Sequence, residues 1–171
     1  MTLPDQPRSM HDAGVRARRR TMLGLPHMVQ LKTFAERLRG PGLEVPDFDP
    51  LDGGVEARAL FLFEKPGRMT AGQSGSGFIS RDNDDPTAAA TFEFMQQAAI
   101  PRELTIIWIV IPWWNGTLAV TKSELQNGAS RVNELIHLLP RLRTVVLVGR
   151  KAAAAKSHLE TTGLPLGHLE K

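Results

Sequence analysis

Residues 59–67 read ALFLFEKPG, and this stretch decides the fold class. Five apolar residues form a run of strand length that ends at Glu64, after which Pro66 and Gly67 turn the chain. A strand without polar alternation is typical of a parallel sheet that is covered by helices on both faces. The stretch therefore predicts a buried strand that places the Glu64 carboxylate at the edge of a sheet.

The same pattern returns twice later in the chain. Residues 104–114 and 144–149 are further apolar runs, and each strand-like run is followed by a segment with helical periodicity. Strands that alternate with helices indicate an α/β fold, and we predict a three-layer α/β/α sandwich around a short parallel sheet. Helices are expected at residues 25–40, at 87–99 behind an Asp85 N-cap and Pro86, behind the capping-box sequence TKSE at 121–124, and at 150–162.

Length and composition narrow the class of protein. The chain has 171 residues and a hydrophobic fraction of 42%, which suits one globular domain with a sizeable core. The chain has no cysteine, which excludes disulfides and Cys-ligated metal centres and fits a reducing compartment. No apolar run reaches the roughly 18 residues of a membrane span. We therefore expect a cytoplasmic protein that needs no membrane, metal or cofactor.

Basic residues are concentrated near the N-terminus. Residues 1–40 hold 8 Lys and Arg against 3 Asp and Glu, whereas the remainder holds 13 against 15. The sequence RARRR at 16–20 is either an arm that attracts nucleic-acid phosphates or a solvated terminal segment. Because residues 1–22 are polar and aperiodic, we expect them to be a basic, flexible segment that precedes a single domain over 23–171.

Ligands of open parallel sheets bind beyond the carboxyl ends of the strands. Three loops qualify here, at residues 64–85, 112–120 and 149–151. The first is long for a compact domain, and such loops are usually functional. Position alone does not decide whether Glu64 acts on a ligand or only caps a strand end.

Three other features of these loops each allow two interpretations. The sequence GQSGSG at 72–77 fits a phosphate-binding loop or a flexible one, and it lacks the Lys-Ser/Thr ending of a P-loop. The sequence SRDNDDP at 80–86 fits a cation site or, at lower cost, a turn that leads into a helix. Trp113 and Trp114 could stack on a base or cover the sheet as a hydrophobic lid.

The order of these motifs resembles the uracil-DNA glycosylase superfamily, and is closest to its family 4 members. The resemblance covers roughly residues 24–166 and rests on Phe63-Glu64-Lys65-Pro66-Gly67, on Phe78 in SGFISR, and on AAIPREL at 98–104. It implies a glycosylase that flips a uracil or another deaminated base out of DNA and hydrolyses its N-glycosidic bond. By resemblance, the catalytic residues are Glu64 and His168, the substrate-binding residues are Lys65, Pro66, Gly67, Phe78, Ile109 and Asn115, and the DNA-binding residues are Arg68 and Arg81.

The chain departs from the family pattern at several of these positions. Lys65 stands where some members carry an acidic general base, and the iron–sulfur cysteines of family 4 are absent. Ile109 stands where an Asn contacts the uracil edge, so Asn115 is the candidate replacement. His168 lies near the place of a His-Pro-Ser-Pro-like motif but is followed by Leu-Glu-Lys, which suggests a C-terminal truncation. A catalytically impaired binder of DNA or of a partner is therefore the alternative, and a mononucleotide-binding module is the third hypothesis.

Overall fold

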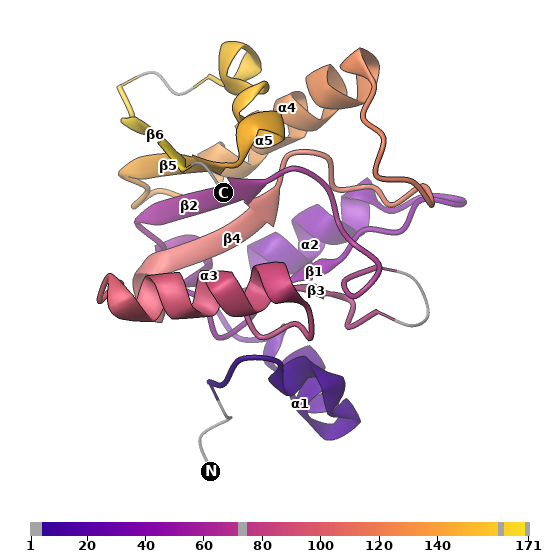
Figure 1. The fold of residues 1–171 in the computed structure, drawn as a ribbon, viewed down its shortest axis with the longest axis vertical. Coiled ribbons are helices and arrows are strands. Elements are labelled where there is room, and N and C mark those ends of the chain that lie inside the picture. Colours follow the sequence, from indigo (N-terminus) through magenta and orange to yellow (C-terminus); the bar gives the residue numbers. More distant parts are fainter. Residues whose placement is uncertain (1–4, 72–74, 161–162, 170–171) are drawn as a thin grey trace.

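The computed structural model describes residues 5–71, 75–160 and 163–169 (Figure 1). Its main sheet has four parallel strands in the order β4-β2-β5-β6. All the pairings are parallel, as the unbroken apolar runs predict. The strands are β2 at Ala59–Phe63, β4 at Thr105–Ile109, β5 at Thr144–Val148 and β6 at Leu166–Leu169.

Helices lie on both sides of this sheet. Figure 1 shows α3 on one side and α2 on the other, which is compatible with the three-layer α/β/α arrangement. The α/β class with a parallel sheet is thereby confirmed. The helices are α1 at Ala13–Met22, α2 at Val29–Leu38, α3 at Pro86–Gln97, α4 at Lys122–His137 and α5 at Arg150–Ala153, with short 3-10 turns at Ser9–His11, Gly54–Glu56, Arg102–Leu104 and Lys156–His158.

The predicted helix starts are confirmed by their capping groups. The Asp85 carboxylate accepts a hydrogen bond from the Ala88 amide at 2.9 Å, and Pro86 occupies the first helical position of α3. Thr121 and Glu124 form a reciprocal capping box at the start of α4. Because these caps satisfy backbone donors at the helix starts, local sequence alone fixes where both helices begin.

The two faces of the sheet bury different side chains. Side chains alternate along a strand, so Trp108 of β4 faces one way while Ile107 and Ile109 face the other. Trp108 stacks on Phe48 at a ring distance of 3.7 Å, and Phe34 of α2 packs edge-on against the same indole. The α2 face is therefore closed by an aromatic cluster, and the opposite face carries the aliphatic residues of β4.

The described part of the N-terminal segment, residues 5–22, does not fit the expectation of a flexible segment over 1–22, whose first four residues lie outside the described residues. Residues 13–22 form α1, whose Val15 and Arg19 are buried against the rest of the protein. The Arg19 guanidinium contacts Asp49 at 2.5 Å and Asp82 at 2.6 Å. The sequence RARRR is thus neither a free arm nor a solvated tail, because its third arginine, Arg19, is part of the interior.

Three further expectations about the elements need correction. The C-terminal stub supplies a fourth strand, β6, which pairs with β5. The helix expected at 150–162 is shorter, with a four-residue α5 followed by a 3-10 turn. The connector at 41–54 and the long loop at 64–85 each contribute a short strand, β1 at Asp47–Phe48 and β3 at Phe78–Ile79, which pair in parallel.

Candidate functional site

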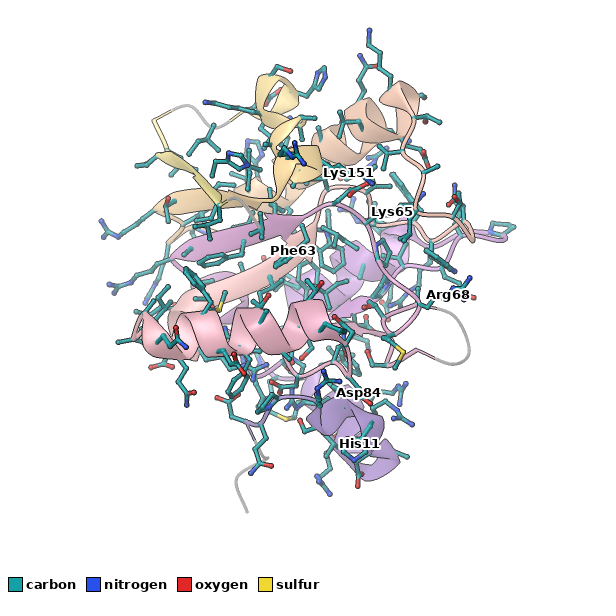
Figure 2. The ribbon with its side chains drawn as sticks, in the orientation of Figure 1. His11, Phe63, Lys65, Arg68, Asp84 and Lys151 are labelled. Atoms are coloured by element: carbon teal, nitrogen blue, oxygen red, sulfur yellow. The ribbon has the colours of Figure 1, made fainter. Side chains whose placement is uncertain are left out.

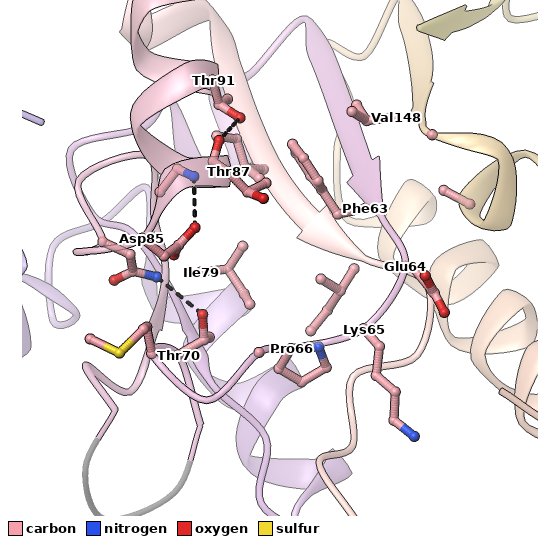
Figure 3. A pocket seen from close by; sticks show the side chains of 18 of the residues that line it. Phe63, Glu64, Lys65, Pro66, Thr70, Ile79, Asp85, Thr87, Thr91 and Val148 are labelled. Atoms are coloured by element: carbon pink, nitrogen blue, oxygen red, sulfur yellow. Dashed lines mark hydrogen bonds between the residues drawn. The ribbon is translucent and has the colours of Figure 1, made fainter. Parts of the chain in front are cut away.

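A cavity of about 800 Å³ lies at the carboxyl edge of the sheet, on the face opposite Trp108. Its base consists of Ile109, Phe63 and Val148, which are the last residues of the neighbouring strands β4, β2 and β5. Ile107, two residues before Ile109 on the same face of β4, completes the base. Phe63 pairs with Ile109 in the register of β2 and β4, so these side chains stand side by side. Figure 3 shows the Phe63 ring projecting toward Thr87 and Thr91 of α3.

The polar side of the cavity comes from the segment before α3 and from the loop after β2. It comprises Thr70, Asn83, Asp85 and Thr87. The Asn83 side-chain amide donates to the Thr70 hydroxyl at 3.2 Å and to the Phe78 carbonyl at 2.9 Å. Asp85 is occupied as the N-cap of α3. These bonds hold the loop after β2 against the start of α3. The polar side chains of the cavity therefore lie across from its apolar base.

Glu64 lines the cavity directly beyond the end of β2, as the sequence predicts. Its Oε1 atom is buried and accepts no hydrogen bond from the described residues. The ammonium group of Lys151, at the start of α5, lies 3.3 Å from Oε1 and forms an ion pair with it. Gly149, with φ 88°, makes the turn that brings α5 to this position, and a residue with a side chain would be strained there. The Glu64 carboxylate is thus held at the cavity by its ion pair with Lys151.

Exposed cations and apolar side chains surround the cavity. Arg68, Arg150 and Lys151 line it and reach the surface, and Figure 2 shows Arg68 and Lys151 flanking the loop that carries Lys65. Met69 and Leu118 also line it and are 42% and 60% exposed. A surface that combines cations with apolar side chains suits a ligand with phosphates and rings.

Lys65, Pro66 and Gly67 line the cavity as expected, and Asn115 does not, but the Lys65 ammonium group binds elsewhere. The Lys65 ammonium is buried and donates to Asn115 Oδ1 at 2.8 Å, to the Ala119 carbonyl at 3.2 Å and to Glu124 Oε1 at 3.1 Å. Figure 3 shows its side chain extending away from Phe63 and Ile79. Asn115 also donates to Glu124 and does not line the cavity. The substrate-binding roles expected for the Lys65 and Asn115 side chains are therefore corrected to structural ones.

Phe78 does not stack in the cavity. Its side chain is fully buried and its ring is not among the lining groups, because β3 pairs with β1 and turns the ring into the core. The guanidinium of Arg20 lies over the Phe78 ring, 5.8 Å from the ring centre. The neighbouring residue Ile79 lines the cavity instead. Among the described residues, the aromatic side chain that lines the cavity is Phe63, which strand alternation aims at this face.

His168 lies away from Glu64. It is exposed, stands on the edge strand β6 and pairs in register with Leu147 of β5. Val148, the next residue of β5, faces the cavity, so Leu147 and its partner His168 face the opposite side of the sheet. The expected catalytic role of His168 is therefore not supported by its position.

Arg81 lines the cavity but points its charge inward. Its side chain is 5% exposed and lies 3.7 Å from Asp52, and its guanidinium donates to the Thr105 hydroxyl at 2.6 Å. Burial lowers the pKa of this guanidinium, and the charge of Asp52 acts in the opposite direction. The expected contact of Arg81 with DNA phosphates is thus corrected to an interior contact, whereas Arg68 remains available at the surface.

Arg81 belongs to a buried ion cluster that holds the segment before α3. The cluster comprises three buried carboxylates and three buried guanidinium groups, and the half-exposed Asp5 pairs with it from outside through Arg102. Arg102 is central, because it contacts Asp49 at 2.7 Å, Asp52 at 2.9 Å and Asp82 at 3.0 Å. The members of the buried ion cluster are Arg19, Asp49, Asp52, Arg81, Asp82 and Arg102.

The carboxyl groups of this cluster have different pKa shifts. Burial and the neighbouring charge of Asp49 raise the pKa of Asp52 to about 6, against the attraction of Arg102. Burial also disfavours the ionised form of Asp49, but Arg102 and Arg19 outweigh it and lower the pKa of that carboxyl. The interpretation of SRDNDDP as a turn that leads into a helix is confirmed, because residues 81–85 form a turn and Asp85 caps α3, while Asp82 also serves as an internal counterion.

Other loop features are settled by their contacts. The Trp113 indole donates to the Leu38 carbonyl at 3.0 Å, and Trp114 bridges to Glu44, so neither ring lines the cavity. Residues 72–74 of the glycine loop lie outside the described residues. Among the residues that the structure describes, no group of three or more His, Asp or Glu is arranged to hold a metal ion. Within the same ranges, no helix has the length and apolar character needed to cross a membrane.

Sequence reasoning missed Phe63, Asn83 and Lys151 as site residues. Strand alternation could have found Phe63, because it is two residues from Phe61 on the same face of β2. Lys151 follows a glycine at the end of β5, which is the position where loops reach the ligand edge. Asn83 lies in the loop at 64–85 that the sequence marks as a candidate ligand loop, but its own role depends on how that loop folds back.

Comparison with models of known protein families and with curated proteins returned no match.

Proposed function

We propose that this protein is a DNA glycosylase that binds an extruded deaminated base in the cavity and hydrolyses its N-glycosidic bond. The observation that carries this proposal is the Glu64 carboxylate, which lines a cavity of about 800 Å³ beyond the end of β2 and is held there by an ion pair with Lys151. A volume of this size lies within the usual range of small-molecule sites. The resemblance of residues 63–67 to the glycosylase motif points to the same carboxylate.

The chemistry requires a carboxylate near the sugar. Cleavage of the N-glycosidic bond builds positive charge on the sugar, which an ionised Glu64 stabilises. The same carboxylate accepts a proton from the water that attacks the anomeric carbon. Lys151 fixes the orientation of Glu64 through their ion pair.

The remaining groups of the cavity suit an extruded nucleotide. Phe63 offers the face on which a base stacks, a contact worth about 1–3 kcal/mol per base in single-stranded complexes. Arg68 and Arg150 lie where the sugar-phosphate backbone would pass. Base extrusion itself costs a few kcal/mol, so these contacts offset part of that cost.

A catalytically impaired binder of DNA is the second candidate. Two positions favour it: Ile109 gives the base of the cavity no hydrogen-bonding group, and His168 lies on the opposite face of the sheet. Such a protein would hold an extruded base without stabilising the departing base anion. Binding to uracil-containing or abasic DNA without product release would support it.

The test is release of free base from oligonucleotides. Single- and double-stranded DNA containing uracil, hypoxanthine or xanthine is incubated with the wild-type protein and with Glu64→Gln, which preserves shape and removes the charge. Glu56→Gln is the matched control, because Glu56 is an exposed carboxylate that pairs with Arg141 outside the cavity. We expect product from the wild type and from Glu56→Gln. Product that does not exceed the Glu64→Gln level would overturn the enzymatic proposal.

A further inference from the structure

One buried atom on the polar side of the cavity lacks a partner. Asn83 is 2% exposed and lines the cavity, and its Oδ1 forms no hydrogen bond with the described residues. The orientation of this amide is fixed, because its nitrogen donates to the Phe78 carbonyl, which can only accept. The free atom is therefore an acceptor. A buried acceptor without a partner is costly unless a ligand or a water supplies a donor.

Thr70 supplies the complementary group beside it. Its hydroxyl oxygen accepts from the Asn83 amide, so the hydroxyl hydrogen remains for another acceptor. Within the ranges that the structure describes, this hydrogen has no protein acceptor. Thr70 lines the cavity, and its hydroxyl oxygen lies 3.2 Å from the Asn83 amide nitrogen. Asn83 and Thr70 are thus two neighbouring lining residues, of which one carries an acceptor and the other a donor without a partner in the described ranges.

We propose that the Asn83–Thr70 pair recognises the deaminated edge of the extruded base. Uracil and hypoxanthine carry an imino N–H next to a carbonyl, which matches the Asn83 acceptor and the Thr70 donor. Cytosine and adenine carry a ring nitrogen acceptor next to an amino donor, which is the opposite pattern. Deamination therefore converts a mismatched edge into a matched one, and the pair selects its product over its precursor.

The composition of the cavity supports this placement. The base of the cavity is aliphatic or aromatic, so Ile109 and Phe63 can hold the faces of a ring but not its polar edge. The polar groups are gathered on the side of Thr70 and Asn83. In the family pattern, the residue at position 109 recognises the edge of the base. We assign this recognition to the loop before α3 in this protein. The inference rests on the proposed function for its ligand, a base in DNA.

The test is equilibrium binding of single-stranded oligonucleotides that differ at one base. It uses the Glu64→Gln protein, so that no substrate is consumed, and compares uracil with cytosine and hypoxanthine with adenine. A two-bond match predicts a preference of about tenfold for the deaminated base. We expect Asn83→Ala and Thr70→Val to reduce this preference to about twofold or less while general DNA binding persists.

Asn133→Ala is the matched control. The Asn133 amide donates to the His158 carbonyl and accepts from the Glu160 backbone amide, but it lies outside the cavity, so its loss should leave the preference unchanged. Thr70→Val decides the question if Asn83→Ala does not fold. A preference that survives in the folded variants, or its absence from the starting protein, would overturn the inference. Binding selectivity does not depend on product release, so this failure is distinguishable from failure of the proposed activity.

Discussion

Lys65 and Asn115, which are 50 positions apart in the chain, are joined by a hydrogen bond of 2.8 Å between the ammonium group and the amide oxygen. The first follows β2 and the second follows β4, so this bond ties together two loops at the ligand edge. The Lys65 ammonium also reaches Glu124, in the capping box of α4. A single buried cation therefore fixes Glu64, the loop after β4 and the start of a helix relative to one another.

Lys65→Met should destabilise the protein and loosen the loop after β4. The change removes three hydrogen bonds from a charged donor while keeping most of its apolar stem. Bonds to charged groups contribute about 1.5–3 kcal/mol each, but Glu124 is partly solvated and recovers some of the loss, so we expect a decrease of about 2–3 kcal/mol in the free energy of unfolding. Urea denaturation measures the decrease, and amide exchange at residues 115–120 measures the loosening. Lys122→Met, at an exposed position of α4, is the control, and an equal loss in both variants would contradict the role of Lys65.

Arg102→Met should be among the most damaging substitutions in the chain. It leaves Asp49, Asp52 and Asp82 buried with one of their main counterions removed. Breaking a buried ion pair from one side costs about 3–5 kcal/mol. Arg143→Met removes an exposed guanidinium without a side-chain contact in the described ranges and should change stability by less than about 0.5 kcal/mol. A thermal melt of both variants checks this expectation, which fails if Arg102→Met is no worse than its control.

The Asp52 carboxyl should raise the free energy of unfolding as the pH falls from 7 to mild acid. Its folded pKa of about 6 lies above the usual 3.8, so the folded state binds the proton more tightly than the unfolded state. The resulting stabilisation is complete below the unfolded pKa and is lost as pH rises through about 6. The shift corresponds to on the order of 3 kcal/mol.

Urea denaturation of the wild type and Asp52→Asn at pH 4.5 and pH 7 isolates this effect. Other titrating groups largely cancel in the difference between the two proteins. We expect the wild type to gain stability relative to Asp52→Asn at the lower pH. A difference that is independent of pH would show that the Asp52 carboxyl is not shifted in the folded state.

Ile109→Asn should increase the release of uracil if the proposed function holds. The new amide would stand beside Phe63 at the base of the cavity, where it can bond to the edge of a base. The substitution places a polar group in an apolar site and should cost about 1–3 kcal/mol of stability. Base release and melting temperature are measured together, with Ile109→Leu as the control of similar volume. Equal product from the two variants would show that position 109 does not reach the base.

Much of the architecture follows from local sequence signals. The five residues of β2 are the apolar run ALFLF, and both long helices after it begin at the caps that Asp85 and Thr121 predict. These features depend on neighbours within four positions, which a sequence displays directly. The order of the strands could not be predicted from local sequence. For example, β6 is short and half-buried, and its place in the sheet depends on its pairing with β5.

The site was predicted less well, because its side chains are placed by long-range contacts. Glu64, Pro66, Gly67 and Ile109 were found, since the end of a parallel strand marks the ligand edge. Phe78 was expected in the site but lies in the core, because β3 pairs with β1. This contact spans about thirty residues, and no local pattern indicates it. Lys65 and Arg81 were expected at a ligand, but both charges are neutralised by partners that are distant in sequence.

The burial of the Arg19 side chain has a consequence for the design of shortened variants of the protein. An expression variant trimmed to residue 23, which the polar composition of the first residues invites, would strip a guanidinium from the interior and leave Asp49 and Asp82 to share fewer counterions. Those two aspartates lie on segments that pack beside the cavity, so trimming would weaken the support of a site that is far away in sequence. An affinity handle is therefore better attached before a retained first helix than used to replace it.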